Sequence, residues 1–190
     1  TLSSGGSITY STSDNPFDTG IHNQGWWSAT SDNFDTNDNI FVGQLGSDSL
    51  NNFFTFTLRG LQSGDSVVGA ILRINDTGSG DGPFPVTYSL FDVSTDAATL
   101  NANDGTSAAI FNDLGSGVLY ASTLLNANPA SPFDITLNAS AVSAINAAIG
   151  GYFSIGGTLS PGGAIPEPAS LALLGIGLAG LGAMRRRKTA

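Results

Sequence analysis

Apolar and polar residues alternate with a period of two in many segments before position 166, a pattern that predicts β-strands. In residues 51–58, for example, Phe54, Phe56 and Leu58 fall on one face of a strand. Stretches rich in Gly, Ser, Asn and Asp separate these segments, and such residues favour turns. The predicted strands cover residues 7–12, 26–30, 39–44, 51–58, 67–75, 86–93, 108–112, 118–124, 133–137 and 152–159.

One segment has helical spacing instead. Val142, Ile145 and Ile149 lie three or four positions apart, Asn138 is suited to cap the first turn, and Gly150 is suited to end the helix in the left-handed conformation. The pattern therefore predicts an all-β, jelly-roll-like antiparallel β-sandwich over residues 1–159, with one short helix across one end. A brief flexible linker is expected over residues 160–165.

The charge of the chain excludes several classes of function. Only 11% of its residues are charged and the net charge is −9. Before position 166 there are 14 aspartates against Arg59 and Arg73, so no basic surface is available for nucleic acid. The absence of cysteine excludes disulfides, thiolate nucleophiles and Cys-ligated metals. The chain begins at Thr1 without Met, which we interpret as the result of removal of a secretory peptide.

The last 25 residues contain three distinct parts in order. Pro166, Glu167 and Pro168 come first, followed by an apolar run over residues 169–184 in which Ser170 is the one polar residue. We interpret this run as a single C-terminal transmembrane helix, about 24 Å long and slightly shorter than a typical hydrocarbon core. The basic cluster Arg185, Arg186, Arg187 and Lys188 then predicts that the tail is cytoplasmic and the body lies outside. A buried core helix is the alternative interpretation of the apolar run.

This three-part order resembles the PEP-CTERM sorting signal. The resemblance implies a protein of Gram-negative bacteria that make exopolysaccharide. It also implies that the chain is exported, held transiently in the inner membrane, and processed near Pro166, Glu167 and Pro168 by the membrane enzyme exosortase. Members of this family are commonly proteins of the cell surface or the extracellular matrix. The segments FSIGGTL and TYSLFDVST resemble β-sandwich ectodomains often joined to such an anchor, which supports the fold alone.

An Asp-rich stretch over residues 32–39 suggests a metal site. Its carboxylate and amide oxygens are ligands that suit Ca²⁺, and the hypothesis is that Asp32, Asp35 and Asp38 bind one calcium ion. The stretch does not fit an EF-hand, because Ile40 stands where glycine is required. The alternative is that these side chains form solvated turns.

Two adjacent tryptophans suggest a ligand site. If Trp26 and Trp27 lie in a strand, their rings point to opposite faces, so one belongs to the core and the other is expected at the surface. An exposed indole ring can stack on a sugar. The alternative is that a neighbouring loop buries both rings.

The sequence gives little support for an enzyme. No Glu occurs before position 166 to serve as the usual acid of a glycosidase, and no G-x-S-x-G nucleophile motif is present. We therefore expect a non-enzymatic surface or matrix protein with a structural or adhesive role in the exopolysaccharide matrix, and self-association is one form of that role. The alternatives are a carbohydrate-binding module that depends on calcium and, third, a secreted hydrolase.

Overall fold

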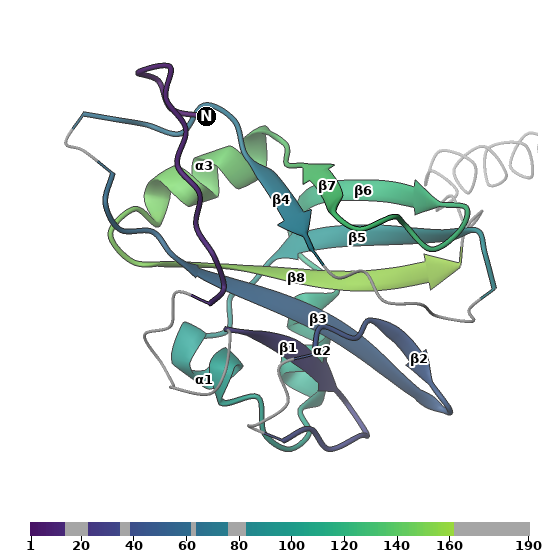
Figure 1. The fold of residues 1–190 in the computed structure, drawn as a ribbon. Helices are drawn as coiled ribbons and strands as arrows, with labels where there is room; N and C mark the ends of the chain where they lie inside the picture. Colours follow the sequence, from purple (N-terminus) through teal and green to yellow (C-terminus); the bar gives the residue numbers. More distant parts are fainter. Residues whose placement is uncertain (14–22, 35–38, 62–63, 76–82, 162–190) are drawn as a thin grey trace, which may run out of the picture.

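The alternating segments form antiparallel strands in the computed structural model, which describes residues 1–13, 23–34, 39–61, 64–75 and 83–161. Three short helices accompany the strands (Figure 1). The strands are β1 (Gln24–Ser28), β2 (Gly43–Leu45), β3 (Asp48–Thr57), β4 (Ile71–Ile74), β5 (Val86–Asp92), β6 (Leu119–Leu125), β7 (Phe133–Thr136) and β8 (Tyr152–Pro161). The helices are α1 (Ala97–Ala102), α2 (Ala108–Leu114) and α3 (Ala139–Ala147).

Six strands form one large sheet, in which the order is β1-β3-β8-β5-β6 and β2 pairs with the start of β3. The last strand in sequence, β8, therefore lies in the middle of the sheet, between β3 and β5. Strand β3 is buried on both faces between Leu50 and Thr55. Phe53 and Phe54 consequently belong to two different cores, because consecutive side chains in a strand point to opposite faces.

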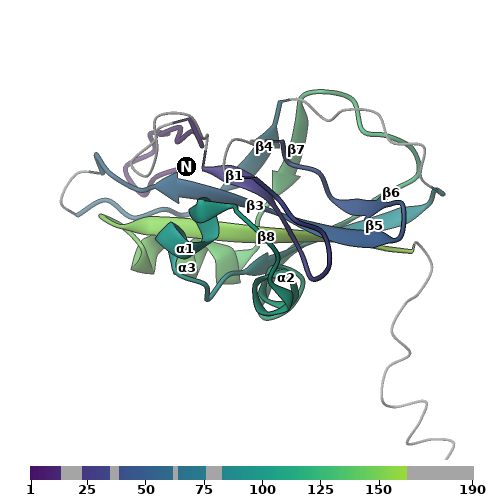
Figure 2. The same ribbon diagram turned by 90° about the horizontal axis from the view of Figure 1, so that it is seen from below.

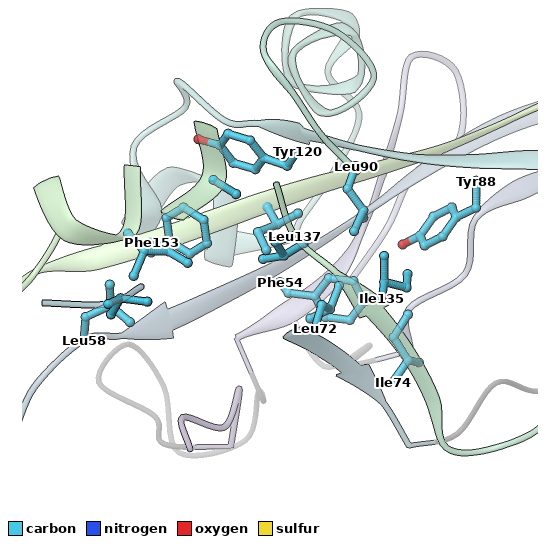
Figure 3. Packing of buried hydrophobic residues seen from close by; sticks show 14 residues of the cluster. Phe54, Leu58, Leu72, Ile74, Tyr88, Leu90, Tyr120, Ile135, Leu137 and Phe153 are labelled. Atoms are coloured by element: carbon cyan, nitrogen blue, oxygen red, sulfur yellow. The ribbon is translucent and has the colours of Figure 1, made fainter. Parts of the chain in front are cut away.

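The larger core lies between the large sheet and a second layer made of the β4–β7 pair and α3. Phe54, Leu90 and Ile155 contribute from the sheet, and Leu72 and Ile145 from the second layer. The labelled side chains in Figure 3 include residues of β3, β4, β5, β6, β7 and β8, and they converge on this one region. Burial of this much aliphatic and aromatic surface is the main force that holds the two layers together.

The smaller core lies on the opposite face of the sheet, beneath α1 and α2. Trp27 and Phe53 pack there against Leu100 of α1 and against Ile110 and Leu114 of α2. Figure 2 shows α2 and the β4–β7 pair on opposite sides of the large sheet. Within the described residues the two sheets thus contain six and two strands, an arrangement less symmetric than the paired sheets of a jelly roll.

The structure confirms an antiparallel, mainly β architecture but differs from the expectation of one helix. Residues 108–112, predicted as a strand, form most of α2, which begins at Ser107, whose hydroxyl accepts from the N–H of Ile110. Helix α1 was not predicted, and it begins at Asp96, whose carboxylate accepts from two N–H groups of the first turn. Both helices are so short that their stability comes from packing on the sheet rather than from intrinsic propensity. Residues 7–12 were also predicted as a strand, but they do not form one.

Helix α3 has the predicted N-cap, whereas its C-cap is Ala148, with a φ of −92°, and the left-handed Gly150 follows two residues later. The side chain of Asn138 accepts a hydrogen bond from the N–H of Ala141 at 3.1 Å, and Gly150 adopts a φ of +87° just after the helix. The chain then enters β8, which continues to Pro161, so two residues of the expected linker belong to the strand.

The described part of the chain contains no helix that is both long and apolar enough to span a membrane. The apolar run over residues 169–184 lies outside the described residues.

Candidate functional site

Both tryptophans of β1 are buried. Trp26 is 7% exposed and Trp27 is 4% exposed, and the indole N–H of Trp27 donates to the backbone oxygen of Leu100 at 3.1 Å. The expectation that one ring lies at the surface was wrong, because β1 is covered on both faces. Neither ring presents a face on which a sugar could stack. The structure instead agrees with the alternative, in which both rings are buried.

The Asp-rich stretch is described only in part. Asp32 is exposed, whereas Asp35 and Asp38 lie outside the described residues, so the calcium hypothesis remains a prediction. Asn33 is buried, and its side-chain amide donates to the backbone oxygen of Trp26 at 2.9 Å and to Oδ1 of Asn103 at 2.8 Å. In residues 1–13, 23–34, 39–61, 64–75 and 83–161 no three His, Asp or Glu side chains form a group that could hold a metal ion.

Several aspartates in the described segments accept hydrogen bonds from nearby backbone and hydroxyl groups. Asp113 accepts from the N–H and the hydroxyl of both Ser94 and Thr95. Asp48 accepts from the hydroxyls of Thr30 and Ser31, and these bonds lower the pKa of its carboxyl. Such carboxylates orient loops and helix ends, which is a structural role.

One uncharged surface of the large sheet is a group of six residues, here called the Ser/Thr face. Thr87 and Ser89 of β5 alternate with Tyr88 and Leu90, which point into the larger core, so the two hydroxyls lie on the other side of the sheet. The strand registers place residues of β6 and β8 beside them in two rows. The rows are Ser122–Ser89–Thr158 and Leu124–Thr87–Ser160.

The strand pairing sets the spacing of the Ser/Thr face. Neighbouring strands lie about 4.8 Å apart, and residues of the two rows lie about 6.7 Å apart along each strand. The hydroxyls of Ser89 and Ser122 are 3.2 Å apart, and Leu124 is 54% exposed. Gly115, at the end of α2, lies against Thr158 and bounds the face on that side.

The Ser/Thr face contains no charged side chain, although the whole chain has a net charge of −9. It offers hydroxyl groups that can both donate and accept hydrogen bonds, beside the one apolar side chain of Leu124. An array of hydroxyls on a sheet surface can hydrogen-bond to a neutral, hydroxyl-bearing polymer, either directly or through water. It does not enclose a small molecule, since small-molecule sites are concave.

These six residues are not recognisable as a site in the sequence alone. The one local indication is the alternation of Thr87 and Ser89 with the apolar Tyr88 and Leu90. That alternation shows one polar face on one strand. It does not show that β6 and β8 continue the face, because their pairing with β5 joins residues distant in sequence.

The sorting residues Pro166, Glu167, Pro168, Arg185, Arg186 and Arg187 lie outside the described residues. The family model of the PEP-CTERM protein-sorting motif matches residues 164–188. No curated protein and no solved structure matches the chain.

Proposed function

We propose that this chain, which carries a PEP-CTERM protein-sorting motif, is an adhesive, non-enzymatic protein of an exopolysaccharide matrix. The motif implies export and a C-terminal membrane-anchoring signal that exosortase recognises. Export and a membrane-anchoring sorting signal thus follow from the motif. The adhesive role, the location in the matrix and the Gram-negative host are our proposal.

The observation that supports the adhesive role is the Ser/Thr face. Its hydroxyls match the hydrogen-bonding groups of a neutral polysaccharide, and Leu124 can contact the apolar C–H surface of a sugar ring. An anionic polymer would be repelled by the surrounding net charge of −9, so neutral chains are the favoured ligand. Because an exposed face holds each sugar weakly, repeated contacts along a polymer are needed for useful affinity.

The experiment is a calorimetric titration of the full chain in detergent with a soluble neutral glucan and, separately, with alginate as an anionic polymer. We expect saturable heat with the glucan alone. The double variant Ser89→Ala with Ser160→Ala removes one hydroxyl from each row, and we expect its affinity to fall by about thirtyfold, since each of the two lost hydrogen bonds contributes roughly 1 kcal/mol net.

The matched control is Ser143→Ala, an exposed serine on α3, distant from the Ser/Thr face. Its affinity for the glucan should equal that of the unchanged chain. If the glucan gives no heat, or if the double variant binds as tightly as the control, the adhesive proposal is wrong. Titration in the presence of EDTA separates the calcium-dependent alternative, because only that alternative loses binding when calcium is removed.

A further inference from the structure

The outer edge of β6 is open from Ala121 to Leu125, which is most of its length. At the start of the strand, Asn138 covers the edge, because its N–H donates to the backbone oxygen of Tyr120 at 2.9 Å and its side-chain amide to that of Leu119 at 2.7 Å. From Ala121 to Leu125, β6 pairs with β5 alone among the described strands. An unpaired edge exposes backbone N–H and C=O groups that can accept another strand.

The opposite edge of the sheet is closed. Along β1, the backbone oxygen of Trp26 accepts from the side chain of Asn33, and that of Ser28 accepts from the N–H of Ser107 at 3.0 Å. Asn33 and Gly105 pair through their backbones beside β1. Side-chain and loop hydrogen bonds thus occupy this edge, which is a common means of preventing strand addition.

The open part of β6, residues 121–125, has none of the residues that usually protect the edge of a sheet. Residues 121–125 read ASTLL and include no charge and no proline. Two copies of a chain with net charge −9 repel each other over most of their surface. An approach of one β6 edge to another, however, pairs two uncharged strips, so this edge is favoured for contact between copies.

We propose that the partner of this edge is a second copy of the chain, joined by antiparallel pairing of β6 with β6 around Thr123. In this arrangement Ser122 lies opposite Leu124 of the partner subunit, and the two large sheets become one. The Ser/Thr faces of both copies then join into a single surface twice as wide. The inference goes beyond the proposed adhesive function and does not depend on it.

The paired area is small. Five residues on each side bury less surface than the roughly 1,200–2,000 Å² of a stable complex. The pairing is therefore weak in dilute solution and is strengthened where copies are concentrated, as by anchoring in one membrane. A covalent trap is the suitable test, since it accumulates a weak contact.

The chain contains no cysteine, so one introduced cysteine reports one contact. Thr123→Cys in the full chain places two thiols on the proposed axis. Residues opposite each other in an antiparallel pair have Cα atoms about 4.5–5.5 Å apart, which allows a disulfide. Under a mild oxidant we expect disulfide-linked dimers to form about tenfold faster than with Ser143→Cys on the exposed side of α3, because pairing raises the effective thiol concentration.

Two further measurements test the edge and the register. Addition of Ser122→Lys to Thr123→Cys places like charges on both strands and should reduce the rate to that of the Ser143→Cys control. A mixture of Ser122→Cys and Leu124→Cys chains should give mainly the mixed dimer. Equal rates for Thr123→Cys and Ser143→Cys, no effect of Ser122→Lys, or no excess of mixed dimer would overturn the proposal. None of these measurements includes polysaccharide, so their outcome is separate from that of the glucan titration.

Discussion

Two adjacent glycines of β8 let both faces of the sheet pack closely at one point. A Cβ at Gly156 would lie 2.5 Å from the backbone oxygen of Leu114, so this glycine allows α2 to lie directly on the sheet. On the other face, Tyr88 crosses Gly157 to donate its hydroxyl to Oδ1 of Asn52 at 3.0 Å. Burial raises the pKa of the Tyr88 phenol, which therefore stays neutral and keeps its proton for this bond.

Gly157→Ala should destabilise the protein. The added methyl group would lie 2.5 Å from the Tyr88 hydroxyl, which must move and lose its bond to Asn52. Overpacking of this kind costs about 1–3 kcal/mol, which corresponds to a fall in the melting temperature of about 2–12 °C. The measurement is thermal unfolding followed by circular dichroism.

The matched control for that substitution is Gly6→Ala. No atom lies within 3.8 Å of the added Cβ at Gly6, and the residue does not have a positive φ. Its melting temperature should stay within about 1 °C of that of the unchanged chain, since surface substitutions away from special sites have effects near zero. Equal melting temperatures for both variants would show that the space above Gly157 is not needed.

At the scale of elements, Asp113 connects α2 to the segment before α1. It lies in the last turn of α2 and accepts from the N–H and hydroxyl groups of Ser94 and Thr95. Partial burial raises the pKa of the Asp113 carboxyl, but the four hydrogen bonds outweigh this effect and hold its pKa below the usual value. Because this carboxylate is more strongly held in the folded state, it stabilises the fold above the pKa of an unfolded Asp, about 4.

The contribution of Asp113 should be lost as the pH falls below about 4 and the carboxyl takes up a proton. Asp113→Asn should therefore lower stability at pH 7 and flatten the loss of stability between about pH 4 and pH 2. Denaturant unfolding at a series of pH values measures both effects. The control is Asp104→Asn, which removes an exposed carboxylate and changes the net charge equally; a curve for Asp113→Asn identical to that of the control would contradict the assignment.

The position of α2 also shows why short helices are difficult to predict. Residues 108–112 read AAIFN, a short apolar run that fits a buried strand as well as a helix. The helix is selected by its surroundings, where Ile110 and Leu114 pack against Trp27 and Phe53. Those partners are distant in sequence, so the local pattern cannot show whether residues 108–112 form a helix or a strand.

At the scale of the whole molecule, an acidic body and a basic tail belong to one chain. The residues before position 166 contain 14 aspartates and two arginines, whereas the sorting motif at 164–188 carries the arginine cluster. An acidic body stays soluble and avoids anionic polymers. The proposed adhesion and self-pairing would both use uncharged parts of this body, namely the Ser/Thr face and the open edge of β6.

The mature protein should lack the residues beyond about Pro168. Intact-mass measurement of protein from the cell surface should give a chain without the arginine cluster at 185–187, whereas protein from the inner membrane should retain it. As a control, a variant with Pro166→Ala, Glu167→Ala and Pro168→Ala should keep its tail and stay in the membrane fraction. Surface protein that still carries Arg185 would contradict processing at this site.

The sequence by itself determined the features that depend on neighbouring residues along the chain. The sorting signal at 166–188 is linear, so its order of proline, apolar run and arginine cluster suffices for its identification. Most strands were predicted near their observed positions, because the alternation that buries one face is a local property. The cap at Asn138 and the left-handed Gly150 are local for the same reason.

Which segments contact one another depends on the tertiary structure and cannot be read from the local sequence. The tertiary structure inserted β8 between β3 and β5, covered both rings of Trp26 and Trp27, and aligned Ser122, Ser89 and Thr158 in one row across three strands. In the folded chain the edge of β1 is covered, whereas the edge of β6 is open from Ala121 to Leu125. These outcomes depend on pairing and packing between segments far apart in the chain, and the free energy of such contacts is set by the complete arrangement of layers rather than by any local pattern.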